Sequence, residues 1–102
     1  MDDPKPSILN FSRLRAVIQG RVQGVGFRYF VQDRAEELQL VGVCRNLTNG
    51  DVEVVAEGAC GALEALLVAL KQGPRMAHIE NIEAVWLPAT GEFTSFRIAP
   101  TR

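Results

Sequence analysis

The sequence predicts an α+β two-layer sandwich, in which one β-sheet carries two helices on a single face. Three observations lead to this prediction. The chain has 102 residues, which is room for one domain. Its apolar residues alternate in some segments, as in strands, and recur at helical spacing in others. These segments follow the order strand, helix, strand, strand, helix, strand.

The first half of the predicted domain is a strand followed by a helix. Residues 14–20 are short and alternating, which favours a strand. Residues 27–40 place apolar side chains at helical spacing and polar ones opposite. The stripe consists of Phe27, Phe30, Val31, Arg34, Ala35 and Leu38.

The second half begins with a hairpin. The predicted elements are strands at 41–47 and 51–57, a helix at 62–71, a strand at 79–87 and a short fifth strand that includes Phe93, Phe96 and Ile98. Asn49-Gly50 predicts a type I′ turn, because both central positions of that turn need a positive φ. Gly73-Pro74 ends the second helix, whose inward side chains are Leu63, Leu66, Leu67 and Leu70.

This order corresponds to two split βαβ units, the ferredoxin-like arrangement (βαββαβ) with an antiparallel sheet. Right-handed crossovers make the first two strands parallel and insert the third between them. The carboxyl ends of the first two strands then lie at one end of the sheet. We therefore expect the loop after the first strand to approach Asn46, near the end of the second.

Composition and charge limit which further segments, partners and cellular locations we expect for the domain. Residues 1–12 contain acidic residues and prolines and lack the features of a signal peptide, so we expect a flexible leader before a domain at 13–102. No apolar run is long enough for a membrane span. Eleven basic and twelve acidic residues give a net charge of −1, which argues against a nucleic-acid partner. We expect a cytoplasmic protein.

The isolated Cys and His residues point to packing and not to a metal centre. Cys44 and Cys60 form no C-x-x-C pair, and the single histidine, His78, does not complete a zinc set with them. We expect both thiols to pack, His78 to be structural or exposed, and Trp86 to belong to the core. No metal or cofactor is predicted.

The informative segment joins the first strand to the first helix. Gly20, Gly24 and Gly26 leave the backbone free to approach a ligand, and successive N–H groups at the start of a helix can bind an anion. The candidate amides are those of Gln23, Gly24, Val25, Gly26 and Phe27. Arg28 lies in the first helical turn, where a cation opposes the helix dipole and a bound anion compensates. Spacing alone equally allows a tight connection with a solvated arginine.

Asn46 is the second candidate. It lies in a predicted strand, where polar residues are disfavoured, and its amide both donates and accepts, so it is suited to holding a water molecule. The alternative is that Asn46 caps the hairpin or faces solvent. Arg45, its neighbour, should point to the opposite face of the sheet.

These residues resemble two signatures of the acylphosphatase family. The run Gly20 to Arg28 reads Gly-x-Val-Gln-Gly-Val-Gly-Phe-Arg, as in the family's first signature. The second is matched by Gly42, Asn46, Gly50 and Val52. Gly73-Pro74 through Ala77, and Phe93-x-x-Phe96-x-Ile98, also fit the family pattern. The resemblance covers residues 13–98, and it implies the ferredoxin-like fold with Arg28 and Asn46 as the catalytic pair.

The resemblance implies the metal-free hydrolysis of an acyl phosphate to a carboxylate and inorganic phosphate. The amides of residues 23–27 and the Arg28 fork would bind the phosphoryl oxygens, while Asn46 orients the attacking water. A substrate phosphate oxygen would accept the proton, as proposed for the family. We expect a monomer whose only partners are the acyl phosphate substrate and inorganic phosphate, as product and inhibitor.

Two other functions compete with this one. RNA-recognition domains share the fold, and residues 24–30 resemble their aromatic motif, but those aromatics must lie on a central strand and here they open a helix. The second alternative is a regulatory or carrier domain that binds a phosphorylated ligand without turning it over.

Overall fold

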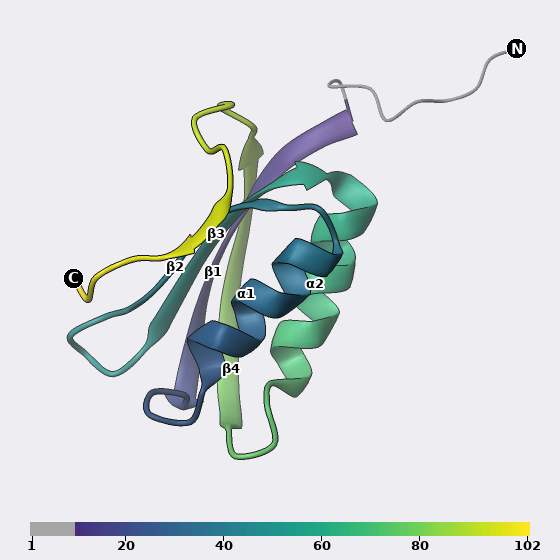
Figure 1. Ribbon diagram of the computed structural model, residues 1–102. Helices are drawn as coiled ribbons and strands as arrows, with labels where there is room; N and C mark the ends of the chain where they lie inside the picture. The colour runs from purple at the N-terminus through teal and green to yellow at the C-terminus, as the bar shows by residue number, and fades with distance from the viewer. Residues whose placement is uncertain (1–9) are drawn as a thin grey trace, which may run out of the picture.

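The computed structural model describes residues 10–102, which form two layers (Figure 1). The elements are β1 (Phe11–Arg21), α1 (Phe27–Glu37), β2 (Val41–Asn46), β3 (Val52–Ala59), α2 (Cys60–Gln72), β4 (His78–Pro88) and β5 (Phe96–Ile98). Both helices lie against the same face of the sheet, as Figure 1 shows. The predicted ferredoxin-like sandwich is therefore confirmed, together with its short fifth strand, although Phe93 lies outside that strand.

The sheet has the predicted topology. Its strand order is β4-β1-β3-β2-β5, and β3 pairs antiparallel with both β1 and β2. The strands β1 and β2 are consequently parallel to each other, with β3 between them. β5 pairs parallel with β2, so the complete sheet is mixed and only its first four strands are antiparallel.

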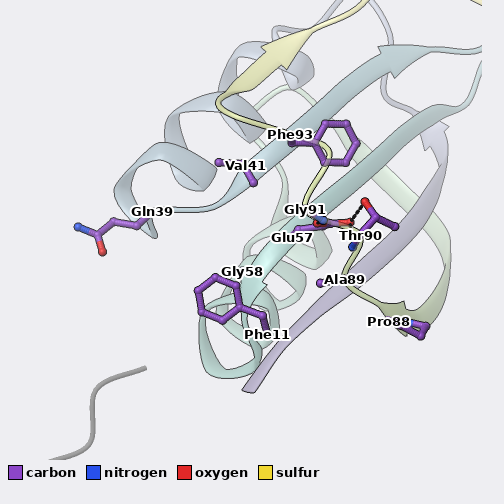
Figure 2. Close-up of a pocket in the computed structure, with 10 residues that line it drawn as sticks. All are labelled: Phe11, Gln39, Val41, Glu57, Gly58, Pro88, Ala89, Thr90, Gly91 and Phe93. Carbon is purple, nitrogen blue, oxygen red and sulfur yellow. Dashed lines mark hydrogen bonds between the residues drawn. The ribbon is translucent and has the colours of Figure 1, made fainter. Parts of the chain in front are cut away.

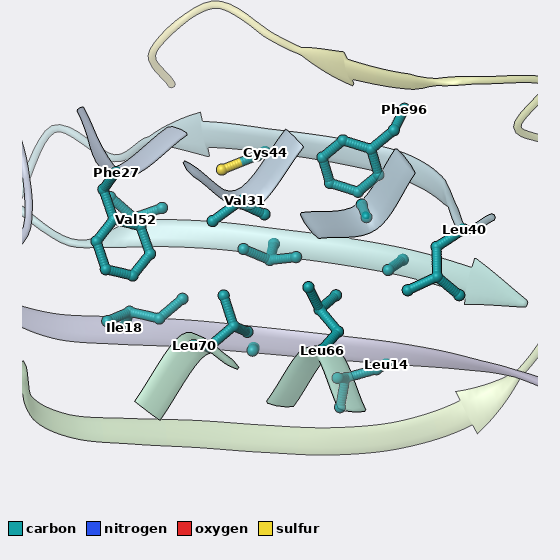
Figure 3. Packing of buried hydrophobic residues seen from close by; sticks show 14 of the residues in the cluster. Leu14, Ile18, Phe27, Val31, Leu40, Cys44, Val52, Leu66, Leu70 and Phe96 are labelled. Atoms are coloured by element: carbon teal, nitrogen blue, oxygen red, sulfur yellow. The ribbon is translucent and has the colours of Figure 1, made fainter. Parts of the chain in front are cut away.

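The core fills the space between the sheet and the helices (Figure 3). Leu14 and Ile18 of β1 point to the helices by strand alternation, and the stripes predicted for α1 and α2 meet them. The buried helical side chains are Phe27, Val31, Ala35, Leu63, Leu66 and Leu70. Burying each large apolar side chain contributes about 1.5–3 kcal/mol, so this layer of contacts holds the helices on the sheet.

The helix α1 ends earlier than the apolar stripe predicts. The backbone N–H of Leu40 donates to Ala35 O at 2.8 Å, and that of Gln39 donates to Glu36 O at 3.0 Å. With Gln39 at φ 60°, these bonds form a Schellman motif that closes the helix after Glu37. The expected end at Leu40 was wrong because the capping bonds, and not the apolar pattern, end the helix.

The β2–β3 connection also differs from the prediction. Gly50 has φ 101°. Within residues 10–102, Gln39 is the only non-glycine residue with a positive φ, so Asn49 has a negative φ and the turn is not type I′. The N–H of Gly50 donates to Leu47 O at 3.1 Å, and the Asp51 N–H donates to the Asn49 side chain at 3.0 Å. The hairpin therefore has a three-residue loop that closes on Gly50.

Two further expectations concern β4 and the beginning of β1. Trp86 is 43% exposed because β4 is an edge strand, so its assignment to the core was wrong. His78 is exposed, as predicted, and Cys44 is buried while Cys60 is half-buried. The expected leader lies mostly outside the described residues, and β1 already begins at Phe11.

The face of the sheet opposite the helices carries a buried carboxylate. Glu57 accepts hydrogen bonds from Arg13 Nε at 2.7 Å, from the Thr90 N–H and hydroxyl at 2.9 Å, and from the Gly91 N–H at 3.0 Å. Burial raises the pKa of Glu57, but the hydrogen bonds from Thr90, Gly91 and Arg13 outweigh it and hold the pKa at about 2. Glu57 thus fastens the β4–β5 connection to the sheet.

Substituting Glu57→Gln should lower the free energy of unfolding by about 2–3 kcal/mol at pH 7, because the amide leaves the guanidinium and backbone donors poorly paired. The folded-state pKa lies below the ordinary value of 4.5, so the contribution of Glu57 is present above pH 4.5 and is lost as the pH falls toward 2. Urea unfolding of the wild type and Glu57→Gln between neutral pH and this acidic range measures the difference in unfolding free energy. Glu92→Gln, which removes an exposed carboxylate that also pairs with Arg13, is the control. Parallel pH curves for the wild type and Glu57→Gln would contradict the prediction.

Candidate active site

The loop between β1 and α1 exposes the backbone of two glycines at the surface. Val22 and Phe27, at its two ends, are buried in the core at 1% and 2% exposure, whereas Gly24 and Gly26 between them are exposed. These two glycines have φ of 75° and 78°, and a Cβ on either would meet no atom within 4 Å. The positive φ, and not tight packing, is therefore what requires glycine here, and the space in front of the loop is open.

The start of α1 leaves backbone N–H groups available. Gly26 is the N-cap residue, with no side-chain cap and no acidic residue in the first turn. The N–H of Phe30 makes the first helical hydrogen bond, to Gly26 O at 3.1 Å. The N–H groups of Phe27, Arg28 and Tyr29 precede that bond and lie at the positive end of the helix dipole. This end of α1 is suited to an anion.

Arg28 adds a positive charge to the same place. It is half-buried, and within residues 10–102 it forms no ion pair. Burial raises the pKa of the Cys44 thiol to about 12, and the charge of Arg28 acts in the opposite direction. Arg28 therefore lies close enough to β2 to act on the residue two positions before Asn46.

Asn46 is the last residue of β2 and faces the helices. It shares this face with buried Cys44 by strand alternation, and Arg45 lies on the opposite face, where its Nε is 3.4 Å from Glu53 Oε1, as predicted. The Oδ1 atom of Asn46 is buried and accepts no hydrogen bond from the described residues. Because buried acceptors are nearly always paired, this oxygen is a candidate for a functional contact.

The side chain of Gln23 joins the loop to the end of β2. Its Nε2 donates to Leu47 O and to Asp51 O, each at 2.8 Å. These bonds place the loop beside the residue that follows Asn46, at the end of the sheet where the loop was expected to approach Asn46. The sequence predicts only a backbone role for Gln23, because no local pattern indicates side-chain partners 24 and 28 positions away.

A hollow lies at the other end of the sheet (Figure 2). It has a volume of about 620 Å³ and lies between Phe11, at the start of β1, and Phe93. Among the described residues that line it, only Glu57 is titratable, and its oxygens are occupied by the bonds described above. The described lining of this hollow therefore offers no free titratable group.

Two findings bear on cofactors and membranes. Within residues 10–102, no three His, Cys, Asp or Glu side chains lie together as metal ligands usually do. None of the helices in that range has the length and apolar character needed to cross a bilayer.

Comparison with known proteins identifies the class. A family model of acylphosphatases matches residues 14–98. An acylphosphatase from Thermus thermophilus is 57% identical over 74 residues, covering 72% of this chain and 84% of the relative. The crystal structure of acylphosphatase from Bacillus subtilis is similar with a TM-score of 0.84 and 36% identity, covering 86% of this chain and 98% of that one. The chain therefore belongs to the acylphosphatase family and is a hydrolase.

The same fold also occurs inside a longer protein. Full-length HypF, in a phosphate- and nucleotide-bound crystal form, is similar with a TM-score of 0.81 and 29% identity. The similarity covers 89% of this chain but only 12% of HypF. A domain of this shape can thus be one part of a larger chain.

The left-handed conformation of Gly26 can be tested by comparison with Gly61, a glycine in a helix. Gly26→Ala should lower the free energy of unfolding by about 1–2 kcal/mol, because a Cβ is strained at φ 78° even where nothing obstructs it. Gly61→Ala, in α2, should instead raise it by up to about 1 kcal/mol, because a Cβ there meets no atom within 4 Å and alanine favours a helix. Urea unfolding measures both. Equal effects of the two substitutions would contradict the left-handed conformation of Gly26.

Proposed function

We propose that this chain hydrolyses acyl phosphates to a carboxylate and inorganic phosphate at the loop of residues 22–26, Arg28 and Asn46. The observation that carries the proposal is an exposed glycine loop at an uncapped helix start, beside an arginine that forms no ion pair within residues 10–102. Family membership supports the reaction class.

In this proposal the phosphoryl group is held by backbone and guanidinium together. The N–H groups of residues 23–27 donate to its oxygens, and the Arg28 fork donates to two of them. Lysine would supply only a point charge at that position. Because phosphoryl transfer depends chiefly on positioning and on charge stabilisation, these donors supply most of what the reaction needs.

Asn46 is the group that we assign to the attacking water. Its buried Oδ1 has no partner among the described residues, and an amide oxygen can accept a hydrogen bond from water. The water oxygen attacks phosphorus in line, the bond from phosphorus to the acyl oxygen breaks, and a phosphate oxygen takes the proton. The leaving carboxylate has a conjugate-acid pKa of about 4, by analogy with Asp and Glu, so it departs without a general acid.

The remaining features of the proposal follow from this chemistry. Arg28 and the amides provide the positive charge, so the reaction is proposed to proceed without a metal or cofactor. Inorganic phosphate fits the same donors and should inhibit competitively.

We propose that the protein acts as a monomer, and its free cysteines are consistent with the reducing cytoplasm.

A second candidate function is binding of a phosphorylated ligand without turnover. The similarity to 12% of full-length HypF favours it, because a domain of this shape is there part of a longer chain. Turnover by the purified protein distinguishes the two, since a binding domain would retain phosphate and release no product.

The first prediction for the site concerns Arg28. The purified wild type should hydrolyse benzoyl phosphate in the presence of EDTA, and Arg28→Ala should lower kcat/KM by at least about 100-fold while weakening phosphate binding. Arg28→Lys should fall between the two, because it keeps the charge and loses the fork. Arg34→Ala, which removes an exposed arginine of the same helix, is the control and should keep full activity. Turnover that requires an added metal would contradict the proposal.

The second prediction separates binding from attack. Asn46→Ala should lower kcat by about 10–100-fold, because the water loses its orientation, while the Kd for phosphate changes less than about threefold. Phosphate titration by calorimetry and steady-state kinetics measure the two quantities. Asn81→Ala, which removes an exposed asparagine of β4, is the control. Full activity of Asn46→Ala would show that another group orients the water.

A further inference from the structure

We propose that the side chain of Gln23 is a positioning residue, which sets the distance between the phosphate-binding loop and Asn46. This inference rests on the proposed function, and it adds Gln23 as a residue that acts through Asn46. The loop binds the phosphoryl group and Asn46 holds the water, so in-line attack depends on how these two parts are placed relative to each other.

The hydrogen bonds of Gln23 connect these two parts directly. Its NH₂ group donates to Leu47 O, one residue after Asn46, and to Asp51 O, where the chain returns to β3. The Leu47 N–H also donates to Asp51 O at 2.8 Å, so all three residues share one set of bonds. Gln23 therefore ties the loop to both ends of the hairpin connection.

The chemistry of the partners determines the orientation of the amide. Both partners are carbonyl oxygens, and only the NH₂ end of the side chain donates. A reversed amide would place Oε1 against two acceptors. Gln23→Glu places a carboxylate there and should be repelled, whereas Gln23→Met has similar length and simply lacks the donors.

The structure offers a close control in Gln32. Its Nε2 donates to a backbone carbonyl, Phe96 O at 3.2 Å, between α1 and β5. Gln32→Met therefore removes the same kind of side chain to backbone bond away from the hairpin. Gln23→Met loses two such bonds and Gln32→Met loses one, so the unfolding free energies of both variants are measured beside their activities.

The test measures kcat and KM for benzoyl phosphate and the Kd for inorganic phosphate, with urea unfolding as a check on folding. Gln23→Met should lower kcat by about 10-fold with KM and the phosphate Kd changed less than about threefold. Gln23→Glu should lower kcat further, and Gln32→Met should leave it unchanged.

A double-mutant cycle with Asn46 decides whether Gln23 acts through that residue. In the Asn46→Ala background, Gln23→Met should lower kcat less than about twofold, because the group it positions is already gone. An equal fractional loss in both backgrounds, or wild-type kcat for Gln23→Met, overturns the positioning role and leaves the proposed function standing. A wild type without turnover overturns the proposed function itself.

Discussion

The parallel arrangement of β1 and β2, with β3 hydrogen-bonded between them, is the constraint on which the site depends. It brings the loop after β1 and the end of β2 to one end of the sheet. Two strand spacings, about 10 Å, separate them. A loop and a side chain can span that distance, and the Gln23 amide does so by reaching Leu47 O and Asp51 O. A sheet in which β1 and β2 were antiparallel would place these groups at opposite ends.

The glycines of the two signature segments have two different physical roles. A Cβ on Gly20 would lie 2.1 Å from His78 O, and one on Gly42 would lie 1.9 Å from Val55 O, so these glycines allow neighbouring strands to approach. Gly24 and Gly26 have open space beside them and are needed for their positive φ. Within the segment Gly20 to Arg28, the first glycine therefore serves strand packing, and Gly24 and Gly26 serve the conformation of the loop.

Much of the fold could be predicted because its causes are local or general. Alternation and helical spacing report which side chains are buried, and the handedness of crossovers then gives the strand order. The predicted helix end at Leu40, type I′ turn at Asn49-Gly50 and core position of Trp86 were wrong. The observed features depend on the capping bonds after α1, on a loop that closes on Gly50 and on a position at the sheet edge. Sequence spacing does not contain that information.

The candidate site was predictable to the same extent. The loop and Asn46 stand out as motifs, because glycines in a strand-to-helix turn and a polar residue in a strand are unusual. The side-chain bonds of Gln23 could not be predicted, since they join residues that only the tertiary fold brings together. The same applies to Asn46 Oδ1, which has no hydrogen-bond partner in the part of the chain that the structure describes.

The distribution of arginines gives the site its sign. The chain has a net charge of −1, so no overall field attracts an anionic substrate. On the open face of the sheet, Arg13 pairs with Glu57 at 2.7 Å, while Arg15 and Arg45 share Glu53. Each of these three arginines has a carboxylate partner, whereas Arg28 pairs with none within residues 10–102. Beside the uncapped end of α1, this guanidinium adds positive charge to the loop of a nearly neutral protein, which is the charge that the proposed phosphoryl site requires.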